Sequence, residues 1–139
     1  LEIDVEDVAE AIKNVDSKLK IFLHLDFSNY FMESFVEKMD RARELLLQDL
    51  KKHITIDELS KEVGVNTTDL KKSFKAIYGD TIYSHLRKHR MEKARELLLE
   101  SDLKIIDIAC AVGYSNASKF SSTFKKIYGV KPNQYRLKK

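Results

Sequence analysis

Hydroxyl and ammonium side chains share one face of a predicted helix in the middle of the sequence. Within Thr67–Tyr78, the side chains of Thr67, Thr68, Lys71 and Lys72 recur at intervals of three and four residues. Lysine donates hydrogen bonds to guanine acceptors or to phosphate, and threonine offers a hydroxyl and a methyl group to base edges. A helix face that only contacts solvent would have the same composition. The elements around this helix must therefore decide whether the face contacts base edges and phosphate or only solvent.

A second predicted helix, Asn116–Tyr128, carries a different set of polar groups at the corresponding positions. They are serines, whose hydroxyls both donate and accept and therefore discriminate weakly between bases. We predict sharper base readout from the first helix and more positioning on the DNA backbone from the second. Asn116 at its start contacts a base or phosphate, or else only caps the helix. The candidates for base contact are Thr67, Thr68, Lys71, Lys72, Asn116, Ser118, Ser121 and Ser122, and those for backbone contact are Lys75, Lys119, Lys125, Lys126 and Arg136.

These two helices are the second halves of an internal repeat. The first half repeats at a spacing of 49 residues and the second at a spacing of 50, so one residue has been added in the second turn. The four glycines of the chain all fall at paired positions. The matched pairs are Leu59 and Ile108, Val63 and Val112, Gly64 and Gly113, Leu70 and Phe120, Phe74 and Phe124, Ile77 and Ile127, Tyr78 and Tyr128, and Gly79 and Gly129.

Each copy is typical of a helix-turn-helix, in which a short helix, a glycine turn and a longer helix follow one another. The short helices are predicted at Ile56–Val63 and Ile105–Val112. Thr55 followed by Glu58 forms a capping box at the first of them. The longer helices turn one apolar face inward. This face is formed by Leu70, Phe74 and Ile77 in the first copy and by Phe120, Phe124 and Ile127 in the second.

One long helix, Thr81–Leu99, is predicted between the copies. A straight helix of that length spans ~28 Å at 1.5 Å per residue, close to the ~34 Å between successive major-groove faces of B-DNA. The second helix of a helix-turn-helix docks in the DNA major groove and is called its recognition helix. We therefore expect the recognition helices Thr67–Tyr78 and Asn116–Tyr128 to read adjacent major grooves on one side of the duplex.

The residues from Thr55 to Arg136 resemble the AraC/XylS-type bacterial transcription regulators. The resemblance is carried by R-M-E-K-A-R-E-L-L at Arg90–Leu98, by G-Y-S-N at Gly113–Asn116, by F-K-K at Phe124–Lys126, and by G-V-K-P with the following Tyr135 and Arg136. It implies a seven-helix DNA-binding unit of two helix-turn-helix subdomains joined by one long helix. It also implies transcription regulation, with double-stranded DNA and RNA polymerase as partners. The family commonly has an aromatic residue where this sequence has His85.

Charge divides the chain into two portions. Residues 1–50 carry 6 Lys+Arg and 12 Asp+Glu, whereas residues 51–139 carry 19 and 10. The basic portion is the one that contains the repeat, as expected of a surface that meets phosphate. We therefore predict an acidic, mostly helical segment at 1–52 and a tandem helix-turn-helix domain at 53–139.

The acidic segment is predicted to begin with a helix at Asp4–Asn14. Residues 19–25 fit a strand or a buried helical turn equally well. A helix follows from Ser28 to about Lys51, whose apolar stripe is a packing face or, alternatively, a dimer helix or the end of a sensor domain. Its members are Phe31, Phe35, Met39, Ala42, Leu45 and Leu46. We expect this chain to be the carboxy-terminal piece of a longer regulator, with a homodimer formed through its N-terminal or missing region.

No catalytic or metal-binding constellation stands out. His85 and His89 are spaced i, i+4 but lack a third ligand with recognisable spacing. The single cysteine, Cys110, is predicted to be a buried or half-buried packing residue, and it excludes an internal disulfide framework. No apolar run reaches the ~18 residues of a membrane span. We predict an all-α, cytoplasmic, non-enzymatic protein without cofactor or metal, and the alternative is a helical module that docks an acidic protein partner.

Overall fold

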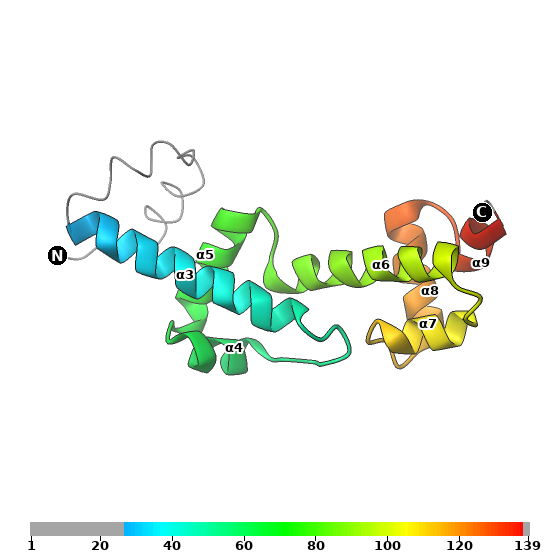
Figure 1. Cartoon of the computed structure of the whole chain (residues 1–139), viewed down its shortest axis with the longest axis horizontal. Helices are drawn as coiled ribbons and strands as arrows, with labels where there is room; N and C mark the ends of the chain where they lie inside the picture. The colour runs from blue at the N-terminus through cyan, green and yellow to red at the C-terminus, as the bar shows by residue number, and fades with distance from the viewer. Residues whose placement is uncertain (1–26, 138–139) are drawn as a thin grey trace. The chain divides into compact units, whose positions relative to one another are not determined.

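The computed structural model describes residues 27–137, with side chains from residue 34 onward (Figure 1). Every regular element in this range is an α-helix, which confirms the all-α prediction. The predicted helix at Asp4–Asn14 and the open assignment at residues 19–25 lie outside the described residues. In chain order the elements are α3 (Phe27–Leu47), α4 (Ile56–Val63), α5 (Thr67–Tyr78), α6 (Ile82–Glu100), α7 (Ile105–Ala111), α8 (Ala117–Tyr128) and α9 (Pro132–Leu137).

Contacts divide the chain into two units. Unit 1 holds α3 as far as Leu46 together with Ile54–Ile82, and unit 2 holds Leu47–His53 together with the chain from Tyr83 onward. The pair α4 and α5 therefore lies in unit 1, and the pair α7 and α8 lies in unit 2. The boundary predicted between residues 52 and 53 follows the change of charge, whereas the contacts place α3 in the same unit as the first helix pair.

The first helix pair is bounded by side chains and turns that the sequence specifies locally. The hydroxyl of Thr55 accepts from the backbone N–H of Glu58 at 3.1 Å, and the Glu58 carboxylate accepts from the N–H of Thr55 at 3.1 Å. This is the predicted capping box. Gly64 ends α4 with a φ of +71°, a conformation that costs a residue with a Cβ about 1–2 kcal/mol. Asn66 then caps α5 by accepting from the N–H of Asp69 at 2.9 Å.

The apolar stripe of α3 is buried within unit 1. Met39 and Ala42 have no exposed surface, and Phe35 and Leu46 are almost fully buried, while Leu45 is half-buried. Leu59, Leu70 and Phe74 of the first helix pair are also fully buried. These side chains confirm the packing-face interpretation of α3, and Phe31 lies outside the residues with described side chains.

Unit 2 has one hydrophobic core, to which α6, α7 and α8 all contribute. Three tyrosines pack against its edge, and Phe124 has the ring of Tyr128 at 4.7 Å and that of Tyr135 at 5.5 Å between centroids. Such aromatic pairs add to the stabilisation from burial alone. The buried core residues are Met91, Ala94, Leu98, Ile108, Ala109, Val112, Phe120 and Phe124.

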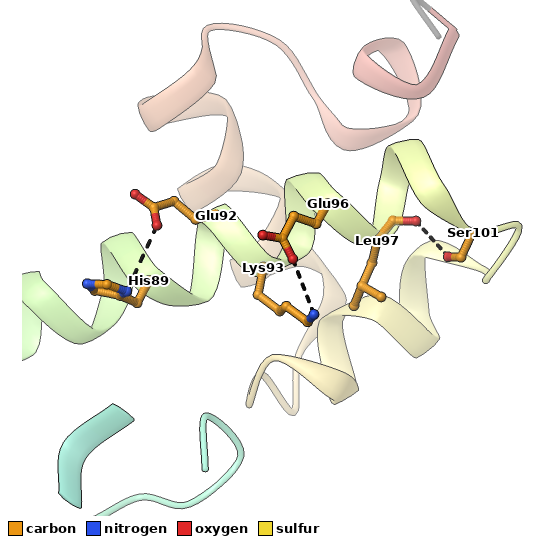
Figure 2. A network of polar contacts seen from close by, with 6 residues as sticks. All are labelled: His89, Glu92, Lys93, Glu96, Leu97 and Ser101. Carbon is orange, nitrogen blue, oxygen red and sulfur yellow. Dashed lines mark hydrogen bonds and ion pairs between the residues drawn. The ribbon is translucent and has the colours of Figure 1, made fainter. Parts of the chain in front are cut away.

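Helix α6 begins and ends one residue later than predicted and presents a charged outer surface. Figure 2 shows two pairs on that surface, His89 with Glu92 at 3.9 Å and Lys93 with Glu96 at 3.2 Å. Exposed pairs of this kind contribute little to stability, so the helix is held by its buried residues.

Two predictions about individual side chains are wrong. Ile127 was expected in the core but is 40% exposed, because Tyr128 takes the inward position beside Phe124. The buried stripe of α8 thus runs through positions i, i+4 and i+8. Cys110 was expected to be buried or half-buried but is exposed. It lies two residues from both Ile108 and Val112, about 200° around the helix from the buried side.

Candidate nucleic-acid interface

Helix α5 separates its residues into a buried face and a polar face. Leu70 and Phe74 have no exposed surface. The polar face holds all five residues predicted from this helix, of which Thr67 is half-buried and the others exposed: Thr68, Lys71, Lys72 and Lys75. The predicted base and backbone candidates of the first helix therefore lie together on one accessible surface.

Packing against α3 fixes the C-terminal end of α5. The hydroxyl of Tyr78 donates to Asp40 Oδ1 at 2.5 Å, and the guanidinium carbon of Arg43 lies 5.7 Å from the centre of the Tyr78 ring. Burial, together with the hydrogen bond to Asp40, raises the pKa of the Tyr78 phenol, which keeps the hydroxyl a donor into the alkaline range. Helix α3 therefore orients the helix that carries Lys71.

Helix α8 shows the same division, with serines at the positions that Thr68, Lys71 and Lys72 occupy in α5. Phe120 and Phe124 are buried, Ser118, Ser122 and the lysines Lys119, Lys125 and Lys126 are exposed, and Ser121 is half-buried. An open groove of about 400 Å³ follows this face, and its lining contains all three predicted serines together with Lys125 and Lys131. Lys131 was not among the predicted contact residues, and its signal in the sequence is a lysine directly before the proline that begins α9.

Local hydrogen bonds define what two of the polar residues can offer. The Ser122 hydroxyl donates to the Lys119 carbonyl at 3.1 Å, so its oxygen is left as an acceptor. The Asn116 side-chain oxygen accepts from the N–H of Lys119 at 3.0 Å. Asn116 is thus the N-cap of α8, and its amide NH₂ remains the group with which it could meet a base or a phosphate.

Arg136 has a structural role that the sequence analysis missed. Its guanidinium donates to the carbonyls of Leu98, Leu103 and Ser101 at 3.2, 2.6 and 3.3 Å. The last carbonyls of a helix need partners from outside its ladder, and Arg136 supplies one to Leu98 in the last turn of α6 and two more to Ser101 and Leu103 just beyond it. Ser101 supplies another by donating to the Leu97 carbonyl at 2.6 Å (Figure 2). The contact of Arg136 with DNA phosphate stays a prediction, beside this structural role.

The rings of the two histidines of α6 are in contact and tilted by 47° to one another. The rings of His85 and His89 lie 4.7 Å apart, and His85 is buried. Over the described residues, no group of three or more His, Cys, Asp or Glu side chains is arranged to hold a metal ion. No helix between residues 27 and 137 is long and apolar enough to cross a membrane.

Comparisons with known proteins identify a helix-turn-helix domain in this chain. A family model described as a helix-turn-helix domain matches residues 59–138. The xylose operon regulatory protein of Escherichia coli K12 is 38% identical over 85 residues, which is 61% of this chain but only 22% of that protein. This chain thus spans about a fifth of the length of that curated relative.

Solved structures support the same assignment. The C-terminal domain of AraT, a response regulator from Geobacillus stearothermophilus, is 37% identical with a TM-score of 0.70, over 73% of this chain and 85% of that one. An AraC-type transcriptional regulator from Chromobacterium violaceum is 26% identical with a TM-score of 0.68, over 76% and 94% of the two chains. The resemblance carried by Thr55–Arg136 is confirmed. This chain belongs to the AraC/XylS-type family of helix-turn-helix transcription regulators.

Proposed function

We propose that this chain binds double-stranded DNA sequence-specifically and so regulates transcription, with α5 and α8 entering adjacent major grooves. The observation that carries the proposal is the duplicated design of these two helices. Each has a fully buried aromatic face, a side-chain cap at its start, a left-handed glycine at its end and an exposed face of lysines and hydroxyls. Family membership supports the same function.

The two helices have unequal roles in this proposal. Helix α5 reads bases through Thr68, Lys71 and Lys72, since lysine pairs with guanine acceptors and threonine meets base edges. Helix α8 offers serines, one of which is left as an acceptor, and it is flanked by lysines that suit phosphate. The first motif therefore gives the sharper sequence preference.

The rival function, docking of an acidic protein partner, loses the surface that the sequence offered for it. That surface was the apolar stripe of α3, and its side chains Phe35, Met39 and Leu46 are buried in unit 1. Among the described residues, the large apolar side chains that remain exposed for such a contact all lie in unit 2: Tyr83, Leu99, Leu103, Ile106, Ile127 and Leu137. DNA binding is the better-supported function.

Four further proposals rest on family membership alone. RNA polymerase is the partner through which the DNA-bound protein regulates transcription, and the protein forms a homodimer through its N-terminal region. The protein acts in the cytoplasm, where its DNA target lies, and it has no enzymatic activity.

Affinity selection from a random pool of ~30 bp duplexes tests the proposal. We expect two unlike boxes centred about 10 bp apart, one sharp and one diffuse. If about six to eight lysines and arginines reach phosphate, fluorescence anisotropy of the winners should give a log affinity that falls with log salt at a slope of about −5 to −7. Binding to no duplex would overturn the proposal and favour protein docking.

A further inference from the structure

A basic pocket of about 350 Å³ lies in unit 2, beside the start of α8. Its lining contains Arg87, Arg90 and Lys119, and His53 adds a fourth group that is cationic when protonated. No aspartate or glutamate is among the lining residues. The pocket therefore concentrates positive charge without an internal counterion.

Arg90 is the unusual member of this pocket. Its side chain is 8% exposed, its Nε donates to the Leu50 carbonyl at 3.0 Å, and its guanidinium carbon lies 5.9 Å from the centre of the Tyr114 ring. Its Nη2 is buried and has no hydrogen-bond partner among the described residues. A buried charge without an anionic partner is costly, and burial lowers the pKa of this guanidinium. An anion held in the pocket would offset that cost.

The remaining lining groups are suited to the same ligand. Arg87 and Lys119 are exposed at the pocket, and Lys119 lies in the first turn of α8, where the helix dipole favours negative charge. Ser115 and Asn116 add a hydroxyl and a side-chain amide. Arginine forks, a lysine and a helix N-terminus together match the several oxygens of a phosphate group better than the two of a carboxylate.

We propose that this pocket binds a phosphate group, through Arg87, Arg90 and Lys119. Two sources supply that chemistry, the backbone of DNA docked on α8 and a free phosphorylated small molecule. The first source rests on the proposed DNA-binding function, whereas the second does not depend on it. In either case the bound group holds the turn that sets the start of α8.

The test begins with inorganic phosphate and the full chain, at an ionic strength kept constant with chloride. We expect saturable shifts of the Ser115–Lys119 amide resonances in NMR spectra, and much weaker shifts with acetate. The variant Arg87→Gln should bind phosphate about tenfold more weakly or not at all, because one charged fork is lost. Arg95→Gln, on the same helix but outside the pocket, is the matched control and should bind as the native chain does.

DNA then identifies the source. If a backbone phosphate occupies the pocket, Arg87→Gln should reduce the salt slope of duplex binding by about one, and Arg95→Gln should not. An unchanged slope beside lost phosphate binding would assign the pocket to a free ligand. Absence of saturable phosphate binding by the native chain, or equal binding by Arg87→Gln, overturns the pocket proposal. Phosphate binding by a chain that binds no duplex would overturn only the DNA function.

Discussion

The side chains of the two candidate recognition helices differ in what they donate and accept. Exposed Lys71 carries a charged donor, whereas the Ser122 hydroxyl already donates to its own helix and presents only an acceptor. A charged donor on a guanine edge discriminates more strongly than a single neutral acceptor. Single residues thus account for the unequal roles proposed for α5 and α8.

Replacing Lys71 with alanine should weaken binding to the selected duplex by about 1–3 kcal/mol and relax the preference at one base pair. Lys125→Ala is the matched control on α8, since it also removes one exposed lysine. It should weaken binding to all duplexes alike and reduce the salt slope by about one. Anisotropy on the selected site and on single-base variants of it measures both effects. Equal losses on every duplex for both variants would contradict the assignment of Lys71 to base readout.

Gly113 illustrates a residue whose identity is set by its neighbours. Its φ is +96°, and an added Cβ would fall inside contact distance of the Leu50 carbonyl oxygen and 3.0 Å from the Arg90 guanidinium carbon. Gly64 has a φ of +71° but open space around the added atom. A substitution at Gly64 therefore introduces backbone strain alone, whereas a substitution at Gly113 adds steric overlap.

Gly64→Ala should lower the free energy of unfolding by about 1–2 kcal/mol, the cost of the left-handed conformation alone. Gly113→Ala should cost about 1–3 kcal/mol more, because the backbone near Leu50 must move. Urea unfolding followed by circular dichroism compares them. An equal loss for both variants would mean that the turn at Gly113 accommodates the methyl group freely.

Among the elements, the helices that the sequence predicted best are those whose ends are encoded locally. Thr55 with Glu58, Asn66 and the paired glycines fix the ends of α4 and α5 within a few residues of chain, and both helices have the predicted bounds. Ile127 and Cys110 were assigned wrongly, and the structural role of Arg136 was not predicted, because the surroundings of these residues come from distant parts of the chain. Periodicity cannot tell that Tyr128 rather than Ile127 will pack on Phe124 and Tyr135, nor that α9 will return to the end of α6.

The attachment of α9 to α6 can be tested through Arg136. Arg136→Gln should lower the free energy of unfolding by about 1.5–3 kcal/mol, the range for hydrogen bonds from a charged donor, because carbonyls at the end of α6 lose their partner. Lys126→Gln removes an exposed charge and should change stability by less than about 0.5 kcal/mol. Urea unfolding decides between them. Unchanged stability with a reduced salt slope for Arg136→Gln would contradict the structural role and support the predicted phosphate contact.

At the scale of the whole molecule, charge and contacts divide the chain at different places. The acidic portion ends near residue 50, but α3 contributes Phe35, Met39, Ala42 and Leu46 to the buried residues of unit 1. The distribution of charge indicates which surface can bind phosphate, whereas the burial of side chains indicates which segments fold together. The division by charge could be predicted from the sequence directly. The division by burial could not, because it depends on what the apolar stripe of α3 packs against.

A chain of residues 47–139 tests whether the first helix pair needs α3 in order to fold. This chain keeps all of unit 2 and removes only α3 from the described part of unit 1. Loss of a single large buried side chain typically costs about 2–5 kcal/mol, and several such losses exceed the 5–15 kcal/mol that stabilises a typical domain. We therefore expect unit 1 to unfold and unit 2 to stay folded. In NMR spectra, the amide resonances of Leu70 and Phe74 should collapse to random-coil positions, while those of Phe120 and Phe124 should stay dispersed.

A chain of residues 27–139 serves as the control and should keep both sets of resonances, since every side chain described as buried in unit 1 is retained. In duplex selection, the 47–139 chain should lose the sharp box assigned to α5 and keep only the diffuse one. Dispersed Leu70 and Phe74 resonances in the 47–139 chain would instead show that the first helix pair folds without α3. The acidic segment would then be a separate part of the regulator, as its charge predicted, and the orientation of α5 would not depend on Tyr78 and Asp40.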